Sequence, residues 1–320
     1  MNILVVGSSG FIGSNLVAKL MSEGHYVVGT DVDYPKYTKP SWFILADWRS
    51  QMDVYELSKG GYNYAYDEAY CLACLMGGMG FIGDEKKYGY DIAIGSAEII
   101  SNFINFCRDE EIPKVFYSSS ACVYNQNLQT DSNVVALKES DSIPASPDLL
   151  YGWQKLYAEK MFEASGLNVR VARFHNIFGE WGTYDGGKEK APAALCRKIA
   201  MAKDGDEIEV WGSGLQTRSF LYIDECLEGV ELLMNSEYRQ PLNIGSDELI
   251  SVNDLAKMII GISGKKLTIK NIDGNVGVMG RNSDNTLIEK ELGWKPKLPL
   301  HHGITRLYAW VNKQVNEKKN

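Results

Sequence analysis

The stretch NILVVGSSGFIG over residues 2–13 decides the fold class of this chain. Its apolar half, Ile3–Val6, predicts a short buried strand, and the glycines that follow predict a tight turn into a helix over 11–23. Glycine at such a turn lets the backbone approach a pyrophosphate at the helix N-terminus. The stretch therefore predicts a dinucleotide site, with cofactor contacts from Gly7, Gly10, Phe11, Ile12 and Gly13.

The rest of the first half alternates strand-like and helix-like segments, which indicates βαβ units and a Rossmann-like, doubly wound parallel sheet of the α/β class. We expect strands over 2–6, 26–31, 42–46, 68–73, 112–118 and 168–174, and helices over 11–23, 51–58, 88–108 and 150–165. After about residue 175 the alternation loosens. We expect short strands near 207–211, 219–223 and 242–245, and helices near 191–203, 224–235, 252–262 and 301–316.

This change of pattern predicts two domains. Residues 1–175 would form the cofactor-binding domain, and residues 176–320 a smaller α+β domain that binds the substrate, with some elements crossing back. The glycine-rich segment 176–190 between them is long for a loop, which favours a functional role.

Bulk composition excludes several classes of protein. The 320 residues carry a formal net charge of −8, so neither nucleic acid nor an anionic membrane is expected as the main partner. No apolar run reaches the length that spans a bilayer, and a signal peptide is not expected. The six cysteines are scattered, which favours a reducing, cytoplasmic setting. Cys71 and Cys74 form one CxxC without a second pair for zinc, so we expect no metal site and plain core thiols.

Asp31 ends the second predicted strand, about 20 residues past the glycines. A carboxylate there accepts a hydrogen bond from a ribose 2′-hydroxyl and repels a 2′-phosphate. The nearby cations are Lys36 and Lys39, and no arginine is close in the sequence. We therefore expect NAD rather than NADP, with further contacts from Asp47, at the adenine, and from Leu72.

Tyr151 and Lys155 lie four residues apart at the start of a predicted helix and so share one face. An ammonium beside a phenol stabilises the phenolate. The serines Ser118–Ser120 end a predicted strand upstream. Together with the glycine turn, these residues predict a hydride-transfer centre in which Ser120 bonds the reacting hydroxyl and Tyr151 and Lys155 also contact the cofactor.

The chain resembles the extended short-chain dehydrogenase/reductases of the sugar-nucleotide epimerase/dehydratase group, which share its GxxGxxG spacing. Within that group it is most similar to the GDP-mannose 3,5-epimerase family. The similarity is weakest over 32–70 and 123–136. The stretches that carry it are 75–82, 119–124, 137–141, 173–177, 186–194, 215–220 and 280–284.

The resemblance implies a nucleotide-sugar substrate, GDP-mannose in this family, and a homodimer. It implies that Tyr151, Lys155 and Ser120 serve the hydride step, that Cys122 is a base and that Lys190 is the acid on the opposite face. It also implies substrate contacts from Gly77, Gly78, Met79, Ser120, Asn176, Glu189, Lys190, Lys198, Arg218 and Arg281.

The chemistry of these residue types agrees with this assignment. Oxidation at C4 of the sugar makes a ketone and acidifies the hydrogens on C3 and C5, so that inversion needs a base on one face and an acid on the other. Each residue also has a plain structural interpretation. Without a catalytic role, Cys122 would be a buried, unreactive thiol. Lys198 and Arg197 would lie on the solvent-exposed face of a helix, and Arg218 would be a surface cation. His175 is expected to be structural.

Four other functions remain open. A 4,6-dehydratase typically has Asp-Glu where this chain has Ala121 and Cys122, which argues against it. A 4-epimerase needs only the Tyr–Lys–Ser set, and it would leave Cys122 and Lys190 without a role. A related epimerase for another nucleotide sugar, such as a heptose, fits the same residues. A non-catalytic NAD(H)-binding regulator needs the glycine turn but not the hydride residues.

Overall fold

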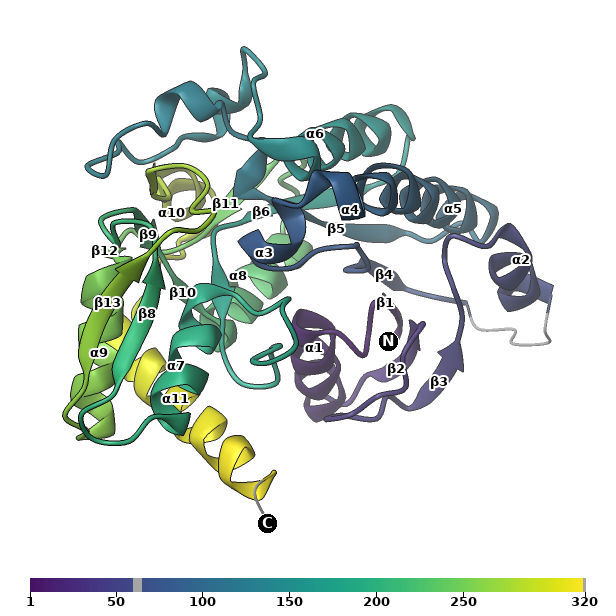
Figure 1. Ribbon diagram of the computed structural model, residues 1–320. Helices are drawn as coiled ribbons and strands as arrows, with labels where there is room; N and C mark the ends of the chain where they lie inside the picture. The colour runs from purple at the N-terminus through teal and green to yellow at the C-terminus, as the bar shows by residue number, and fades with distance from the viewer. Residues whose placement is uncertain (60–64, 319–320) are drawn as a thin grey trace.

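The computed structural model describes residues 1–59 and 65–318, and its largest element is a parallel sheet of seven strands (Figure 1). The strands are β1 (Asn2–Val6), β2 (Tyr26–Asp31), β3 (Trp42–Leu45), β4 (Glu68–Cys71), β5 (Lys114–Ser120), β6 (Val169–Phe174) and β11 (Leu242–Ile244). Their order is β11-β6-β5-β4-β1-β2-β3, with every neighbouring pair parallel. The expected Rossmann-like, doubly wound sheet is confirmed.

Helices bury both faces of this sheet, which is why its strands are apolar at consecutive positions. Ile3 and Val5 of β1 pack into one core cluster with α1 (Phe11–Ser22) and α8 (Ile223–Asn235). Leu4 and Val6 point to the other face. The helices on that face are α2 (Gln51–Lys59), α5 (Ser96–Asp109) and α6 (Leu149–Ala164).

The large sheet and the helices on its faces form one lobe of the molecule. The second lobe contains short strands in three small sheets. Their orders are β12-β9-β14, β13-β8 and β10-β7. The strands are β7 (Ile177–Phe178), β8 (Glu207–Trp211), β9 (Thr217–Ser219), β10 (Leu221–Tyr222), β12 (Leu249–Ser251), β13 (Thr268–Ile272) and β14 (Gly280–Arg281). The helices that pack around them are α7 (Ala191–Met201), α9 (Val252–Ser263), α10 (Thr286–Leu292) and α11 (Leu300–Glu317).

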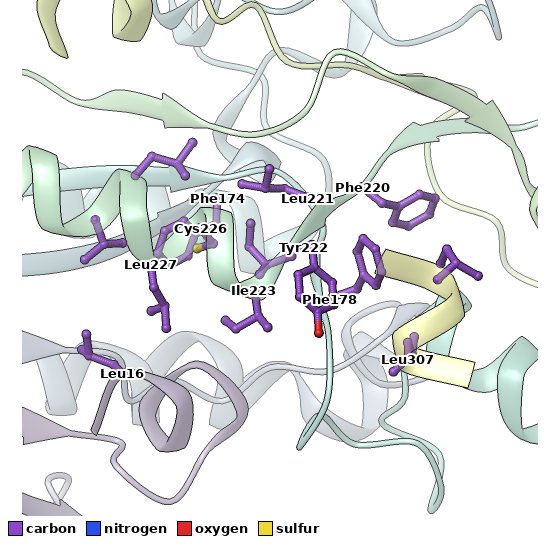
Figure 2. Packing of buried hydrophobic residues seen from close by; sticks show 14 of the residues in the cluster. Leu16, Phe174, Phe178, Phe220, Leu221, Tyr222, Ile223, Cys226, Leu227 and Leu307 are labelled. Atoms are coloured by element: carbon purple, nitrogen blue, oxygen red, sulfur yellow. The ribbon is translucent and has the colours of Figure 1, made fainter. Parts of the chain in front are cut away.

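One hydrophobic cluster joins the two lobes. It runs from Leu16 on α1 through Phe178 and Tyr222 to Leu307 on α11, and Figure 2 shows part of it. Gly303 on α11 is needed at this contact because a Cβ there would lie 2.8 Å from the Phe178 ring. Both β11 and α8 follow residue 176 in the chain, yet β11 is an edge strand of the large sheet and α8 packs against one face of that sheet. The two lobes therefore do not correspond to the two halves of the sequence.

The structure corrects several sequence-based bounds. The helix expected over 88–108 is α4 (Glu85–Tyr90), a π-helical turn over Asp91–Gly95, and then α5. A close approach accounts for Gly95, since a Cβ there would lie 2.8 Å from the Leu75 side chain. The strand expected near 219–223 is divided between β9, which ends at Ser219, and β10, and α8 begins at Ile223. Several elements of two to seven residues were not predicted from the sequence: α3 (Met79–Ile82), β7, β12, β13, β14 and α10.

Within the described ranges, no helix is both long enough and apolar enough to cross a bilayer.

Candidate active site

The glycine turn between β1 and α1 is packed so closely against backbone that no side chain fits at Gly7 or Gly13. Gly7 has φ +87°, and a Cβ there would lie 2.6 Å from the Ala73 backbone nitrogen. A Cβ on Gly13 would lie 2.0 Å from the Gly7 carbonyl oxygen. The turn borders a cleft of about 620 Å³. Gly7, Gly10, Phe11 and Leu72 line it, whereas Ile12 and Gly13 line an adjoining hollow.

The carboxylate of Asp31 lies in the same cleft at the end of β2. It accepts hydrogen bonds from the backbone nitrogens of Ser9 at 2.9 Å and Asp33 at 3.2 Å. Burial raises its pKa, and those two hydrogen bonds act in the opposite direction. The carboxylate is therefore held in place at the position where a ribose would bind.

The cations around this cleft differ from those expected. Lys36 lines the cleft, whereas Lys39 is not among its lining residues. The expectation that no arginine lies close is wrong, because Arg49 lines the cleft, as do Lys188 and Lys318. The Arg49 guanidinium is held 2.6 Å from Asp47, and this pair lowers the pKa of that carboxyl. Because Asp47 neutralises Arg49, the arginine is a weak attractor for a 2′-phosphate.

The residues predicted to serve the hydride step line one hollow at the carboxyl ends of β4 and β5. Tyr151 and Lys155 lie on the first turns of α6 and are only 5% and 1% exposed. The Lys155 ammonium donates to the Ser118 carbonyl at 2.8 Å and lies 5.8 Å from the centre of the Tyr151 ring. Burial raises the pKa of Tyr151 well above its usual value, and a hydrogen bond with Ser120 acts to lower it.

The Cys122 thiol lies beside a buried guanidinium. Its residue is in the 3₁₀ turn that follows β5, where the Cys122 backbone N–H donates to Ser120 Oγ at 3.2 Å. Arg281 Nη1 donates to the Cys122 sulfur at 3.1 Å. Burial raises the pKa of Cys122, and the charge of Arg281 opposes that rise. Arg281 therefore stabilises a thiolate that burial alone would disfavour.

Lys190 faces the same cavity from the second lobe, at the N-cap of α7. Burial lowers the pKa of its ammonium, and the nearby Cys122 acts in the opposite direction. The cavity has a volume of about 390 Å³ and is also lined by Ser120 and Tyr151. A thiol, a phenol and an amine thus line one space.

Two glycines of the segment 77–79 allow it to pack against the segment that carries Lys190. A Cβ on Gly78 would lie 2.3 Å from the Glu189 carbonyl oxygen, and the Gly78 N–H donates to the Lys188 carbonyl at 2.9 Å. A Cβ on Gly77 would lie 2.8 Å from the Phe81 side chain. These contacts hold Gly77, Gly78 and Met79 at the wall of the cavity.

The remaining sequence-predicted substrate residues line this cavity too: Asn176, Glu189, Lys198, Arg218 and Arg281. Arg218 donates to the carbonyls of Thr217, Val276 and Val278, and burial lowers its pKa to about 10. It is half-buried rather than a surface cation. Lys198 Nζ donates to the Glu209 carbonyl at 2.8 Å.

Asn176 and Glu189 are tied to their neighbours. Asn176 Nδ2 donates to the Ser219 carbonyl at 2.9 Å, and Glu189 accepts from Arg197 at 3.1 Å. His175, expected to be structural, is fully buried and within hydrogen-bond distance of Asn243. Burial lowers its pKa to about 3.

Three hollows form one continuous path. The cofactor cleft shares Gly7, Phe11 and Cys74 with a middle hollow of about 290 Å³. That hollow shares Ser120, Tyr151 and Lys190 with the 390 Å³ cavity. The path therefore runs from Asp31, past the hydride residues, to the cationic end of the cavity.

Sequence reasoning missed two residues on this path. Cys74 was assigned to the core with Cys71, but only Cys71 is buried in β4; Cys74 is half-exposed and lines the cofactor cleft. Asp148 was not considered, and its carboxylate lines the substrate cavity and pairs with Arg281 at 2.9 Å. The CxxC spacing did not show that Cys74 leaves the core, and no spacing signal marks Asp148, because its partner Arg281 lies 133 positions away in the chain.

Known proteins match this chain over most of its length. The family model described as "NAD dependent epimerase/dehydratase family" matches residues 3–245. The chain is 41% identical to GDP-mannose 3,5-epimerase from Arabidopsis thaliana, covering 100% of this chain and 84% of the relative. It has the same identity and coverage to GDP-mannose 3,5-epimerase 1 from Oryza sativa subsp. japonica.

Solved structures with this fold share less sequence. UDP-glucose 4-epimerase from Thermotoga maritima, solved with UDP-glucose, superposes with a TM-score of 0.83 at 23% identity, covering 98% of this chain and 100% of that one. MoeE5 in complex with UDP-glucuronic acid and NAD gives 0.80 at 23% identity, with the same coverage. At this level of identity the two structures establish the fold alone.

Proposed function

The chain belongs to the NAD-dependent epimerase/dehydratase family, and we propose that it inverts C3, C5 or both carbons of GDP-mannose. The observation that carries this proposal is the shared cavity of Cys122, Lys190 and Tyr151. A 4-epimerase needs the phenol but neither the thiol nor the amine. The names of the relatives from A. thaliana and O. sativa support the same substrate and the same reaction.

The cofactor is NAD, as in the rest of the family, and the cleft has features that fit it. The turn at Gly7 and Gly13 leaves no space for a side chain and borders the cleft of about 620 Å³ in which a pyrophosphate would lie. Asp31 would hold the ribose, with Phe11, Ile12, Leu72 and Asp47 around it. When bound, NAD accepts a hydride from C4 of the sugar and returns it at the end of each turnover.

Tyr151 would remove the proton from the C4 hydroxyl. Lys155 holds a positive charge near the phenol, and a positive charge favours the phenolate over the buried phenol. Ser120 would hydrogen-bond the same sugar oxygen, because it lines the cavity and already interacts with Tyr151. These three residues account for removal and return of the C4 hydroxyl proton.

Cys122 and Lys190 would perform the inversion. With C4 as a ketone, the hydrogens on C3 and C5 become acidic, and the Cys122 thiolate would take one of them. Arg281 would stabilise that thiolate from 3.1 Å. Lys190 would then donate a proton from the opposite face, and burial eases the donation because it lowers the pKa of the ammonium.

The cationic end of the cavity would hold the nucleotide. Arg218 and Lys198 would supply positive charge for a pyrophosphate, Arg281 would lie at the sugar beside Cys122, and Asn176 and Glu189 would supply polar contacts. Gly77, Gly78 and Met79 would cover the sugar. Because Arg218 and Arg281 are already ordered by hydrogen bonds within the protein, little side-chain entropy would be lost on binding.

We further propose that the enzyme is a homodimer in the cytoplasm. The dimer rests on the resemblance to the epimerase group. All six cysteines are free thiols, which supports a reducing compartment.

Solvent deuterium exchange tests the function directly. GDP-mannose incubated with the enzyme in D₂O should gain deuterium at C3, C5 or both, read by NMR. Exchange at neither carbon, together with inversion at C4, would favour the 4-epimerase. Unchanged substrate and an unreactive bound cofactor would favour the regulator.

A further inference from the structure

Asp148 occupies the N-cap of α6, three residues before Tyr151, but it does not cap the helix. An aspartate at this position ordinarily accepts a hydrogen bond from a backbone N–H in the first turn. Its side chain makes no such bond here. Glu85 of α4 takes over part of that role, because it accepts a hydrogen bond from the Leu150 N–H at 2.6 Å.

The backbone next to Asp148 is also unusual. Leu149 has φ +58°, in the left-handed region that a leucine rarely adopts. Non-glycine residues in that region persist where the surrounding structure requires them. At this point the chain turns into α6, and Asp148, whose side chain does not bond the helix end, is one of the residues that line the cavity.

One oxygen of that carboxylate is fixed and the other is free. Arg281 Nη2 donates to Oδ2 at 2.9 Å, and the same guanidinium bonds the Cys122 sulfur at 3.1 Å and Gln129 Oε1 at 2.6 Å. Oδ1 is buried, and no donor among the described residues lies within hydrogen-bond distance of it. Asp148 as a whole is only 7% exposed.

An unpartnered carboxylate oxygen is costly to bury, because it has lost water without gaining another donor. Among the buried polar atoms without a partner in the described chain, Oδ1 of Asp148 is the one that belongs to a charged group. A donor brought by a ligand would satisfy it. A phosphate is unsuitable, since two negative charges would repel each other. A hydroxyl group is suitable.

We propose that Asp148 is a specificity-determining residue whose Oδ1 accepts a hydrogen bond from a hydroxyl of the substrate's sugar. This inference rests on the proposed function. Its position supports the sugar rather than the nucleotide, because Arg281 ties Asp148 to Cys122, which would act on C3 and C5. The hydroxyls of mannose away from the reacting C3 and C4 positions are those on C2 and C6. Asp148 would therefore select a fully hydroxylated hexose over a deoxy sugar.

The test is a cycle of variants and substrate analogues. Wild type, Asp148→Asn and Asp148→Ala are each assayed with GDP-mannose and with its 2-deoxy and 6-deoxy analogues, as kcat/KM for deuterium exchange at C3 and at C5. For one analogue, loss of the hydroxyl should cost wild type roughly 10- to 100-fold. In the variants the same loss should cost less than about 3-fold, because the acceptor is already gone.

For each protein, the penalty is the loss of kcat/KM when the hydroxyl is removed from the substrate. Dividing the wild-type penalty by the variant's penalty measures the contact between that hydroxyl and Asp148, because a general loss of activity through Arg281 affects both substrates equally and cancels. Glu85→Gln is the matched control, because it disturbs the same helix end without altering the cavity; it should keep the full wild-type penalty. Equal penalties in wild type and both Asp148 variants, for both analogues, would overturn the proposal.

Affinity provides a second measurement that needs no turnover. The Kd values of the same three ligands, and of GDP alone, are measured by calorimetry on wild type and Asp148→Asn. The variant should bind GDP as wild type does and lose its preference for the hydroxylated sugar. If wild type exchanges deuterium but shows no preference for the hydroxylated sugar, the proposal for Asp148 is wrong and the proposed function is unaffected. If wild type neither binds nor turns over GDP-mannose, the proposed function fails with it.

Discussion

The proposed hydride centre and the proposed acid–base centre share a cavity but are assembled differently. Ser120, Tyr151 and Lys155 come from β5 and α6, which are neighbouring elements of one lobe. Cys122 comes from that lobe as well, whereas Lys190 and Arg281 come from the other. The first centre is a product of local chain geometry, and the second exists only where the two lobes meet.

This difference implies that the two centres should respond differently to change. Lys155 is anchored within its own lobe by the Ser118 carbonyl, at 2.8 Å. Lys190 depends on the segment 176–190, which is held by Gly78 and by contacts across the lobes. Variants should therefore separate C4 chemistry from inversion.

Tyr151→Phe should abolish both processes, because inversion requires the C4 ketone. We expect turnover to fall by roughly 10³- to 10⁴-fold with the fold intact, near the upper range for a positioned acid–base group. The measurements are absorbance of the bound reduced cofactor and deuterium exchange. Tyr157→Phe is the control, since Tyr157 lies on the same helix and is exposed. Near-normal activity of Tyr151→Phe would remove the hydride mechanism.

Cys122→Ala should remove inversion and leave C4 oxidation. The hydride residues are untouched, so the cofactor should still be reduced by substrate, while exchange at C3 and C5 falls by about 100-fold or more. Cys107→Ala, which removes a buried thiol on α5, is the control. If the Cys122 variant exchanges both positions at the wild-type rate, Cys122 is an ordinary buried thiol and the 4-epimerase moves ahead.

Lys190→Ala should separate exchange from inversion. Cys122 can still form the enediolate and return deuterium on the same face, so exchange should persist while inverted product falls by about 100-fold. NMR of the recovered sugar distinguishes the two outcomes. Lys203→Ala, on an exposed position beyond α7, should behave as wild type. Inversion at the normal rate without Lys190 would show that another group supplies the proton.

The pH dependence of the two processes should also differ. Exchange needs the Cys122 thiolate, whose pKa is raised by burial, so its rate should increase toward alkaline pH. Inversion also needs protonated Lys190, whose pKa is lowered by burial, so it should decline at a lower pH than an ordinary lysine would allow. The rate of exchange below the pKa of Cys122, and the rate of inversion above the pKa of Lys190, should each change about tenfold per pH unit. Identical profiles for exchange and inversion would contradict separate acid and base groups.

Trp181→Ala should have the smallest effect, on cofactor retention. The Trp181 ring stacks on Tyr37 at the rim of the cofactor cleft, with 5.7 Å between centroids and 5° between planes. Loss of one aromatic pair should speed NAD release roughly 2- to 10-fold. Dilution followed by assay of retained nucleotide measures this. Trp153→Ala, a half-exposed tryptophan on α6, should retain NAD as wild type does, and equal release by both variants would exclude a role for the stack.

The regular lobe was predictable because its signals are local. Ile3–Val6, the glycines after them and the Tyr151–Lys155 spacing each concern a few consecutive residues, and the sheet follows from their alternation with helices. The second lobe was predicted less completely. Its strands β9, β12 and β14 have two or three residues each, which is too few for a hydrophobic period to appear.

By itself, the sequence determined the fold class and the cofactor, and it predicted the glycine turn and the residue types proposed for the hydride step. Only the tertiary structure decided that Arg281 bonds Cys122, 159 positions away. It decided as well that Asp148, at the N-cap of α6, makes no hydrogen bond to the helix end and lines the cavity instead. It also decided that Cys74 lines the cofactor cleft whereas Cys71 is in the core. The physical reason is range. Turns and strands depend on backbone preferences of adjacent residues, whereas a site between lobes depends on which distant side chains burial brings into contact.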